Sequence, residues 1–149
     1  AWLEGPCLRA LHAGGAEALS GQAVHGCTDV TGFGLAGHAA QMAMASGVTI
    51  HLEAAALPIF DGVLPLAAAN RSGGLASNRA HYADRIHLGS AQAEALADVI
   101  FDPQTSGGLL VTIGADAADA VQARLVAAGV LAARVGHTTG PSDHALSIR

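Results

Sequence analysis

One stretch of the sequence, Cys27 to His38, constrains the fold of this chain more than any other. It places a carboxylate, Asp29, between two threonine hydroxyls and directly before two glycines and an apolar helical pattern. A strand that ends on an acidic residue and turns through glycines into a helix brings a hard oxygen ligand close to a helix N-terminus. Such an arrangement suits a metal–phosphate group. From the residues alone, a purely structural role explains the pattern equally well. In that case the Asp29 carboxylate accepts hydrogen bonds from the backbone amides of Thr31 or Gly32 and stabilises the turn.

A second unusual stretch, Phe101 to Gly108, follows later in the chain. Its proline and glycines predict a turn in which Asp102, Gln104 and Thr105 bond to their own backbone. Each stretch alone is a weak indication of function, because glycine-rich turns with a nearby aspartate are common. A helix at 34–45 and a strand at 109–113 are predicted to follow the two stretches.

Taken together and in this order, the two stretches resemble the C-terminal half of the selenophosphate synthetase family, the selenide, water dikinases. The resemblance is carried by Asp-Val-Thr-Gly-Phe-Gly at 29–34 and Pro-Gln-Thr-Ser-Gly-Gly at 103–108. Weaker similarity at 42–48 and 73–79 extends it to most of residues 16–148. The family belongs to a wider ATP-using superfamily that includes aminoimidazole ribonucleotide synthetase, thiamine-monophosphate kinase and a hydrogenase maturation factor.

The resemblance implies a complete enzyme that uses Mg²⁺ and ATP to convert selenide into selenophosphate, with release of AMP and phosphate. Asp29 matches the motif aspartate that, in this family, joins aspartates of the N-terminal half around the metal and the ATP phosphates. Asp29 is therefore the predicted metal ligand. The predicted cofactor-binding residues are Thr28, Thr31, Gly32, Gly34 and Asn78, and no catalytic residue is assigned within this chain.

The chain contains no lysine. The family's selenium chemistry depends on a Cys or selenocysteine and a Lys in a mobile segment of an N-terminal ATP-binding half, which has no counterpart here. We therefore expect residues 16–149 to form a single C-terminal-type domain, preceded by a lead-in at 1–15 that begins the first helix. Alone, this domain is expected to be inactive and to self-associate as a homo-oligomer through the face that meets the missing half.

Two other functions stay open at this point. The chain also fits a domain of another enzyme of the same superfamily, such as a thiamine-monophosphate-kinase-like protein. It fits equally a non-catalytic interaction module that has kept the fold and lost the chemistry.

Composition and charge argue against several classes of protein. The net charge is −5 and the basic residues are scattered arginines, so nucleic-acid binding is not expected. No apolar run approaches the roughly 20 residues that cross a bilayer. Cys7 and Cys27 lack C-x-x-C spacing, which favours a cytoplasmic protein, and Cys27 is expected to be a small buried side chain. The eight histidines form no metal-binding motif, and His38 is expected to face the core.

The hydrophobic periodicity predicts an α+β fold, a layered sandwich of helices on a small mixed β-sheet, which is also the fold of the resembled family. Strands are predicted at 23–29, 48–53, 109–113, 131–137 and 145–149. Helices are predicted at 8–19, 34–45, 60–70, 91–98 and 115–129. Residues 70–84 are predicted to be a polar, glycine-rich loop of the kind that is often functional.

Overall fold

The computed structural model describes residues 19, 24–89, 94–105 and 107–149. The expected lead-in and nearly all of the expected first helix lie outside these residues. The described elements, in chain order, are β1 (Val24–Asp29), α2 (Gly34–Ser46), β2 (Thr49–Leu52), the 3₁₀ helix η1 (Ala54–Ala56), α3 (Val63–Ala67), α4 (Leu75–Tyr82), β3 (Ile86–Leu88), α5 (Glu94–Phe101), β4 (Leu109–Ile113), α6 (Ala118–Ala127), β5 (Gly136–Thr139) and β6 (Leu146–Ile148).

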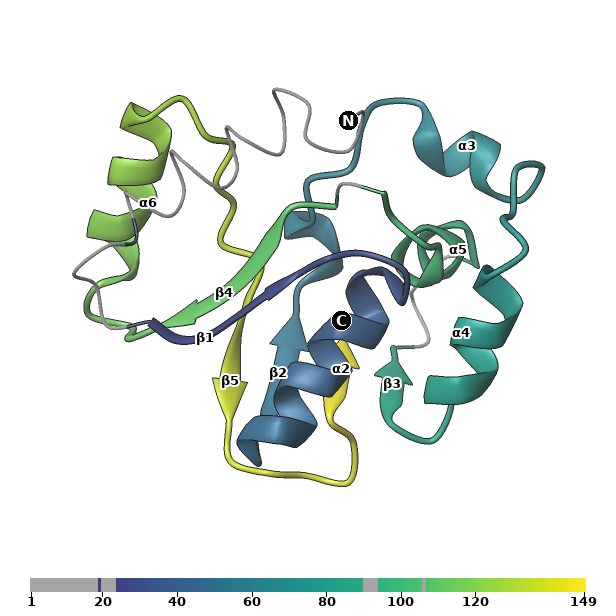
Figure 1. The fold of residues 1–149 in the computed structure, drawn as a ribbon, viewed down its shortest axis with the longest axis horizontal. Helices are drawn as coiled ribbons and strands as arrows, with labels where there is room; N and C mark the ends of the chain where they lie inside the picture. The colour runs from purple at the N-terminus through teal and green to yellow at the C-terminus, as the bar shows by residue number, and fades with distance from the viewer. Residues whose placement is uncertain (1–18, 20–23, 90–93, 106) are drawn as a thin grey trace.

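The strands form two sheets. One has four strands in the order β3-β6-β2-β5, in which β2 and β3 run parallel to β6 and β5 runs antiparallel to β2. The other is an antiparallel ribbon of β1 and β4 (Figure 1). Helices packed on a small mixed sheet confirm the predicted α+β sandwich.

Helix α2 packs against the four-stranded sheet and forms the centre of the core (Figure 1). Its buried face is built of alanines, whose short side chains let the helix approach the strands closely. The core residues with no exposed surface on this helix are Ala36, Ala39, Ala40 and Ala43, and those on the sheet with at most 3% exposure are Ile50, Leu52, Leu146 and Ile148.

The C-terminal end of α2 is fixed by Gly47, as the sequence predicts. Gly47 adopts the left-handed conformation, with φ 63° and ψ 37°. Its N–H donates to the carbonyl of Met44 at 3.3 Å, and the N–H of Val48 donates to that of Ala43 at 3.1 Å. These two bonds form a Schellman motif, which turns the chain directly into β2.

The predicted loop at 70–84 is wrong, because most of its second half is the helix α4. Tertiary contacts stabilise this polar helix: Leu75 is 5% exposed and Tyr82 1%. The three-residue strand β3 that follows was also not predicted, since it is held by pairing with β6, far away in the sequence.

The predicted strand at 131–137 is misplaced. The edge strand β5 begins only at Gly136 and continues to Thr139, two residues beyond the predicted end. Leu131 is 81% exposed, so its apolar character does not reflect burial in the sheet. Helix α3 is shorter than the predicted 60–70. Helix α5 extends to Phe101, three residues beyond the end of the helix predicted at 91–98, whose first three residues lie outside the described part of the chain.

A pair of histidines lies on β2 and β5. His51 and His137 are directly opposite each other, and their rings stack with centroids 4.9 Å apart. The Nε2 atom of His51 is 2.9 Å from the hydroxyl of Thr139, while its buried Nδ1 atom has no partner among the described residues. The pKa of His51 is lowered, and burial is the largest cause. The nearby His137 and Arg149 lower the pKa further, and Glu53 opposes the shift only in part.

The lowered pKa of His51 predicts that acid destabilises the fold. The unfolded chain, in which this imidazole has its usual pKa of 6.5, binds more protons than the folded chain below neutral pH. The contribution of His51 is therefore complete above pH 6.5 and declines as the pH falls toward the lower folded pKa. Urea unfolding at several pH values between 5 and 8 measures this. His51→Gln keeps a partner for Thr139 and should flatten the dependence, and an equally steep dependence in that variant would assign the effect to other groups.

Candidate functional site

Asp29 is the last residue of β1 and is exposed at the end of the ribbon, opposite Leu109 of β4. The hydroxyl of Thr28 donates to the main-chain carbonyl of Asp29 at 3.1 Å. Within the described part of the chain, the Asp29 carboxylate takes part in no ion pair or side-chain hydrogen bond. An exposed carboxylate at a strand end, not needed by the local fold, is available to a ligand.

Three backbone hydrogen bonds join the two unusual stretches of the sequence. The N–H of Val30 donates to the carbonyl of Gly108 at 2.9 Å, and the N–H of Gly107 donates to the carbonyl of Val30 at 3.1 Å. The N–H of Gln104 donates to the carbonyl of Thr31 at 2.9 Å. The second stretch therefore holds the turn that follows the end of β1, and the two stretches form one structural unit.

Gly34 lies where this unit is most crowded. Its φ is +67°, and a Cβ atom there would lie 2.5 Å from the carbonyl oxygen of Ile100 and 2.9 Å from that of Asp102. Gly32 differs, because a Cβ atom at this exposed position would meet no atom within 4 Å. Gly34 is thus required for packing, and phosphate contacts of either glycine stay a prediction.

Asn78 lies on α4 and points into the same unit. Its side-chain amide donates to the carbonyl of Gly32 at 3.0 Å and to that of Phe101 at 2.9 Å. Asn78 is only 6% exposed, so it connects one stretch to the other from the protein interior. Its two amide hydrogens are used by the fold, and the predicted contact with a nucleotide would have to use the amide oxygen.

His38 is buried, as expected, and its ring faces the Asp29 turn. It is 8% exposed, and its Nε2 atom lies 3.1 Å from the hydroxyl of Thr31 and 3.4 Å from the backbone N–H of Phe33. The sequence offered one signal for this contact. His38 is a polar residue close to the start of α2, and the glycine-containing Asp29 turn lies directly before that helix.

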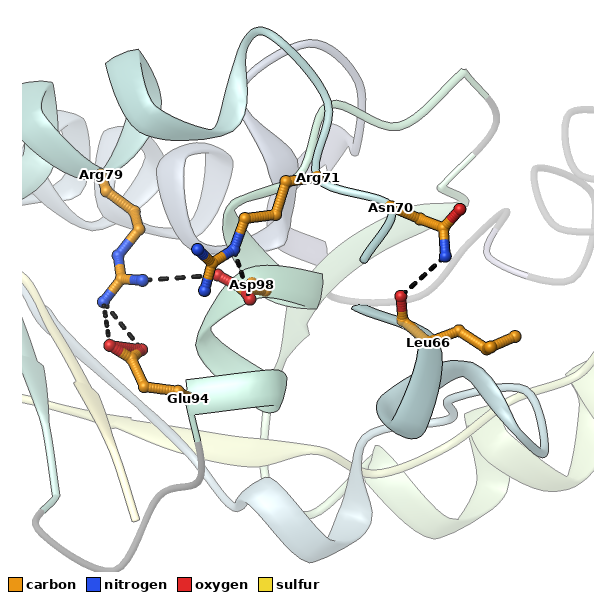
Figure 2. Close-up of polar contacts among 6 residues, drawn as sticks. All are labelled: Leu66, Asn70, Arg71, Arg79, Glu94 and Asp98. Atoms are coloured by element: carbon orange, nitrogen blue, oxygen red, sulfur yellow. Dashed lines mark hydrogen bonds and ion pairs between the residues drawn. The ribbon is translucent and has the colours of Figure 1, made fainter. Parts of the chain in front are cut away.

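An ion-pair network around one buried carboxylate holds α4 in place (Figure 2). The Asp98 side chain on α5 is 2% exposed and accepts from Arg71 at 2.8 Å and from Arg79 at 3.4 Å. Arg79 also pairs with the exposed Glu94 at 3.0 Å. Two arginines compensate the buried carboxylate, as burial of a charge requires. Since Arg79 follows Asn78 on α4, the network also fixes the position of the Asn78 amide.

Cys27 is exposed, and the prediction of a buried side chain is wrong. The two-stranded ribbon explains the difference, because a ribbon leaves part of its surface to solvent where a larger sheet would cover it. Partial burial, and secondarily the nearby Asp29 carboxylate, raise the pKa of the thiol. Cys27 is therefore held in its protonated, less reactive form at neutral pH.

The side chains around Asp29 fit a hard cation such as Mg²⁺ in part. The carboxylate and the Thr31 hydroxyl are oxygen donors of the kind that Mg²⁺ prefers. Among the described residues, no three His, Cys, Asp or Glu side chains come together as a metal site. A cation at Asp29 would thus take its remaining ligands from phosphate, water or residues outside the described set. None of the described helices meets the length and hydrophobicity needed to span a membrane.

Comparison with known proteins shows which sequences resemble this chain. Residues 3–149 match the family model of the AIR synthase related protein, C-terminal domain. The selenide, water dikinase of Nitratidesulfovibrio vulgaris (strain DSM 19637 / Miyazaki F) is 45% identical over 115 residues, covering 76% of this chain and 33% of that protein. The selenide, water dikinase of Geobacter metallireducens (strain ATCC 53774 / DSM 7210 / GS-15) is 42% identical over 123 residues, covering 82% and 36%. The chain thus spans about a third of the length of these curated relatives.

Solved structures share the fold at lower sequence identity. The protein tt0281 of Thermus thermophilus aligns with a TM-score of 0.59 and 22% identity, over 91% of this chain and 34% of that one. The hydrogenase maturation protein HypE, solved in complex with ATP, aligns with a TM-score of 0.56 and 19% identity, over 87% and 32%. At these identities the likeness concerns the fold alone.

Proposed function

We propose a function on the premise that this chain belongs to the family of AIR synthase related proteins and forms their C-terminal domain. Within that family, we propose that it is the C-terminal domain of a selenide, water dikinase. The relatives with this name are 45% and 42% identical, whereas a solved thiamine-monophosphate kinase from Stenotrophomonas maltophilia is 21% identical and HypE is 19% identical. This contrast favours the selenium enzyme over a thiamine-monophosphate-kinase-like protein and over a non-catalytic module.

The proposed reaction of the complete enzyme consumes ATP, selenide and water and yields selenophosphate, AMP and phosphate. Selenide and ATP are then the substrates, and an N-terminal ATP-binding half is the partner of this domain. We also propose a cytoplasmic, homo-oligomeric enzyme that binds neither nucleic acid nor membrane.

The exposed Asp29 carboxylate is the observation in the structure that supports this function best. It lies at a strand end, in a turn whose position is fixed by a second stretch of the chain, and directly before α2. No side chain caps the N-terminus of α2, and its first turn contains no acidic residue. The positive end of the helix dipole therefore faces the Asp29 turn with no acidic side chain of the helix's own first turn to neutralise it.

The residues of this turn would divide the binding of Mg²⁺–ATP among them. Asp29 would hold Mg²⁺, which when bound neutralises charge on the phosphoryl oxygens. The exposed Gly32 leaves room for a phosphate group to approach the backbone. Thr28 and Thr31 add hydroxyl oxygens close to Asp29. The interlocked backbone keeps these groups in place, so that little ordering is needed when the nucleotide binds.

An assay of two proteins tests the proposal. The complete protein that contains this chain is incubated with ATP, Mg²⁺ and selenide under anaerobic conditions, and ³¹P NMR follows selenophosphate while chromatography follows AMP. We expect selenide-dependent formation of both by the complete protein and neither by the 149-residue chain, which lacks lysine and the partner aspartates. Phosphorylation of thiamine monophosphate in a parallel assay, without a selenium product, would overturn the proposal in favour of the kinase alternative.

A further inference from the structure

A buried histidine stands behind the Asp29 turn, and the proposed function so far gives it no role. His38 is 8% exposed, and its Nε2 atom lies within hydrogen-bond distance of two groups of the turn, the Thr31 hydroxyl and the Phe33 N–H. The rings of Phe33 and His38 also contact each other, with centroids 5.5 Å apart. The imidazole therefore has polar contacts with the turn through Nε2 and an aromatic contact through its ring.

The hydrogen bonds determine where the ring proton is. A backbone N–H can only donate, so the Nε2 atom must accept from Phe33 and cannot itself carry a hydrogen. In the neutral imidazole the ring hydrogen then lies on Nδ1. In this tautomer the Nε2 lone pair is shared by two donors, and the Thr31 hydroxyl at 3.1 Å donates to it. The single hydroxyl hydrogen of Thr31 is thus used in the hydrogen bond to His38.

This direction of the hydrogen bond decides what Thr31 can bind. A hydroxyl has one hydrogen and two lone pairs. Because the hydrogen of Thr31 is used in the bond to His38, the Thr31 oxygen can only accept further hydrogen bonds or bind a cation. It can face a cation or a cation-bound water, but it cannot donate to a phosphate oxygen. Thr31 is half-buried and two residues beyond the exposed Asp29, so its oxygen belongs to the same turn as the carboxylate.

We propose that His38 is a positioning residue, which holds the Thr31 hydroxyl with its lone pairs available to the cation, or to a cation-bound water, at Asp29. This inference rests on the proposed function. It assigns Thr31 to the metal side of the site instead of the phosphate side. It also gives His38 an effect on metal binding that a packing residue would not have.

The test measures Mn²⁺ binding by electron paramagnetic resonance in the complete protein, with Mn²⁺ replacing Mg²⁺ and ATP present. His38→Leu removes the acceptor, and Thr31→Val removes the hydroxyl. Each is expected to weaken Mn²⁺ binding by about 10- to 100-fold, the usual effect of losing a group that orients a metal ligand. The binding of ATP without metal should stay unchanged. His38→Gln has an amide oxygen that can accept from the same two donors and should restore most of the affinity.

The variants also separate this inference from the proposed function. Wild-type Mn²⁺ affinity in Asp29→Ala would overturn both, because no cation would then lie at the turn. Weak binding in Asp29→Ala with wild-type binding in His38→Leu and Thr31→Val would overturn the role of His38 alone. Should His38→Leu fail to fold, Thr31→Val and His38→Gln carry the comparison.

A spectroscopic measurement tests the hydrogen-bond direction independently of any metal. Nitrogen-15 chemical shifts of the His38 ring, recorded on the complete protein without metal or nucleotide, distinguish the two neutral tautomers. We expect the proton on Nδ1 in the wild type. A proton on Nε2 would show that His38 donates to Thr31, which would leave the hydroxyl free to bind phosphate and would overturn the inference.

Discussion

Replacement of Asp29 by alanine in the complete enzyme is expected to lower kcat/KM for Mg²⁺–ATP by about 100-fold or more. Losing a group that merely orients a metal ligand typically costs about 10- to 100-fold, and a direct ligand should cost at least as much. The melting temperature should stay within about 2 °C of the wild type, because an exposed side chain at a strand end contributes little to stability. Steady-state kinetics over a range of Mg²⁺ concentrations, together with a thermal melt, measure both effects.

Two control variants show whether the loss is specific. Asp29→Asn keeps the shape of the side chain and removes its charge, and it should be nearly as inactive as alanine if the carboxylate binds the cation. Asp61→Ala removes another exposed aspartate, in the turn before α3, and should leave turnover unchanged. Wild-type turnover in Asp29→Ala with an unchanged melting temperature would mean that Asp29 only shapes its turn.

Local sequence signals were sufficient where an element has a clear pattern and defined ends. Strand β4 matches its prediction at both ends, because an apolar, partly β-branched run lies between Gly108 and Gly114. Helix α2 was predicted to within one residue, since Leu35, His38, Ala39 and Met42 have helical spacing and Gly47 ends the helix, although the face that it buries is the neighbouring, alanine-rich one. In both cases the flanking glycines mark the ends.

Local signals failed where distant residues decide the structure. Helix α4 has a polar sequence that predicts a loop, yet it is helical because Tyr82 packs against Gly37 of α2 and Asn78 bonds to two carbonyls. Strand β3 exists because β6 offers it an edge. Leu131 was placed in a strand because it is apolar, although it is exposed. Short elements of this kind depend on partners that periodicity cannot identify.

The candidate site shows the same division. The two stretches were recognised from their residues, and the structure joins them through the backbone. Exposure of Cys27 and the hydrogen bonds of His38 were not predicted. The first depends on β1 pairing, among the described strands, with β4 alone. The second depends on how the glycine turn brings Thr31 and Phe33 next to the first turns of α2. Sequence spacing indicates which residues are near a site, whereas their hydrogen-bond partners depend on the folded geometry.

The two glycines of the Asp29 turn are expected to respond very differently to alanine. Gly34→Ala should destabilise the chain by about 3 kcal/mol or more, which combines roughly 1–2 kcal/mol for the left-handed backbone with about 1–3 kcal/mol for overpacking. The new methyl group would press on the carbonyls of Ile100 and Asp102, and backbone atoms cannot turn aside as a flexible side chain can. For a domain of this size, such a loss lowers the melting temperature by roughly 10 °C.

Gly32→Ala is the matched control two residues earlier in the same turn. Its φ is not in the left-handed region and its Cβ atom would meet nothing within 4 Å, so its effect should lie within about 0.5 kcal/mol of zero. Urea unfolding of the 149-residue chain measures both variants under identical conditions. Equal stabilities of the two variants would mean that the contact between the two stretches is looser than the distances at Gly34 imply. A large loss confined to Gly34→Ala would instead show that this contact fixes the turn on which Asp29 is presented.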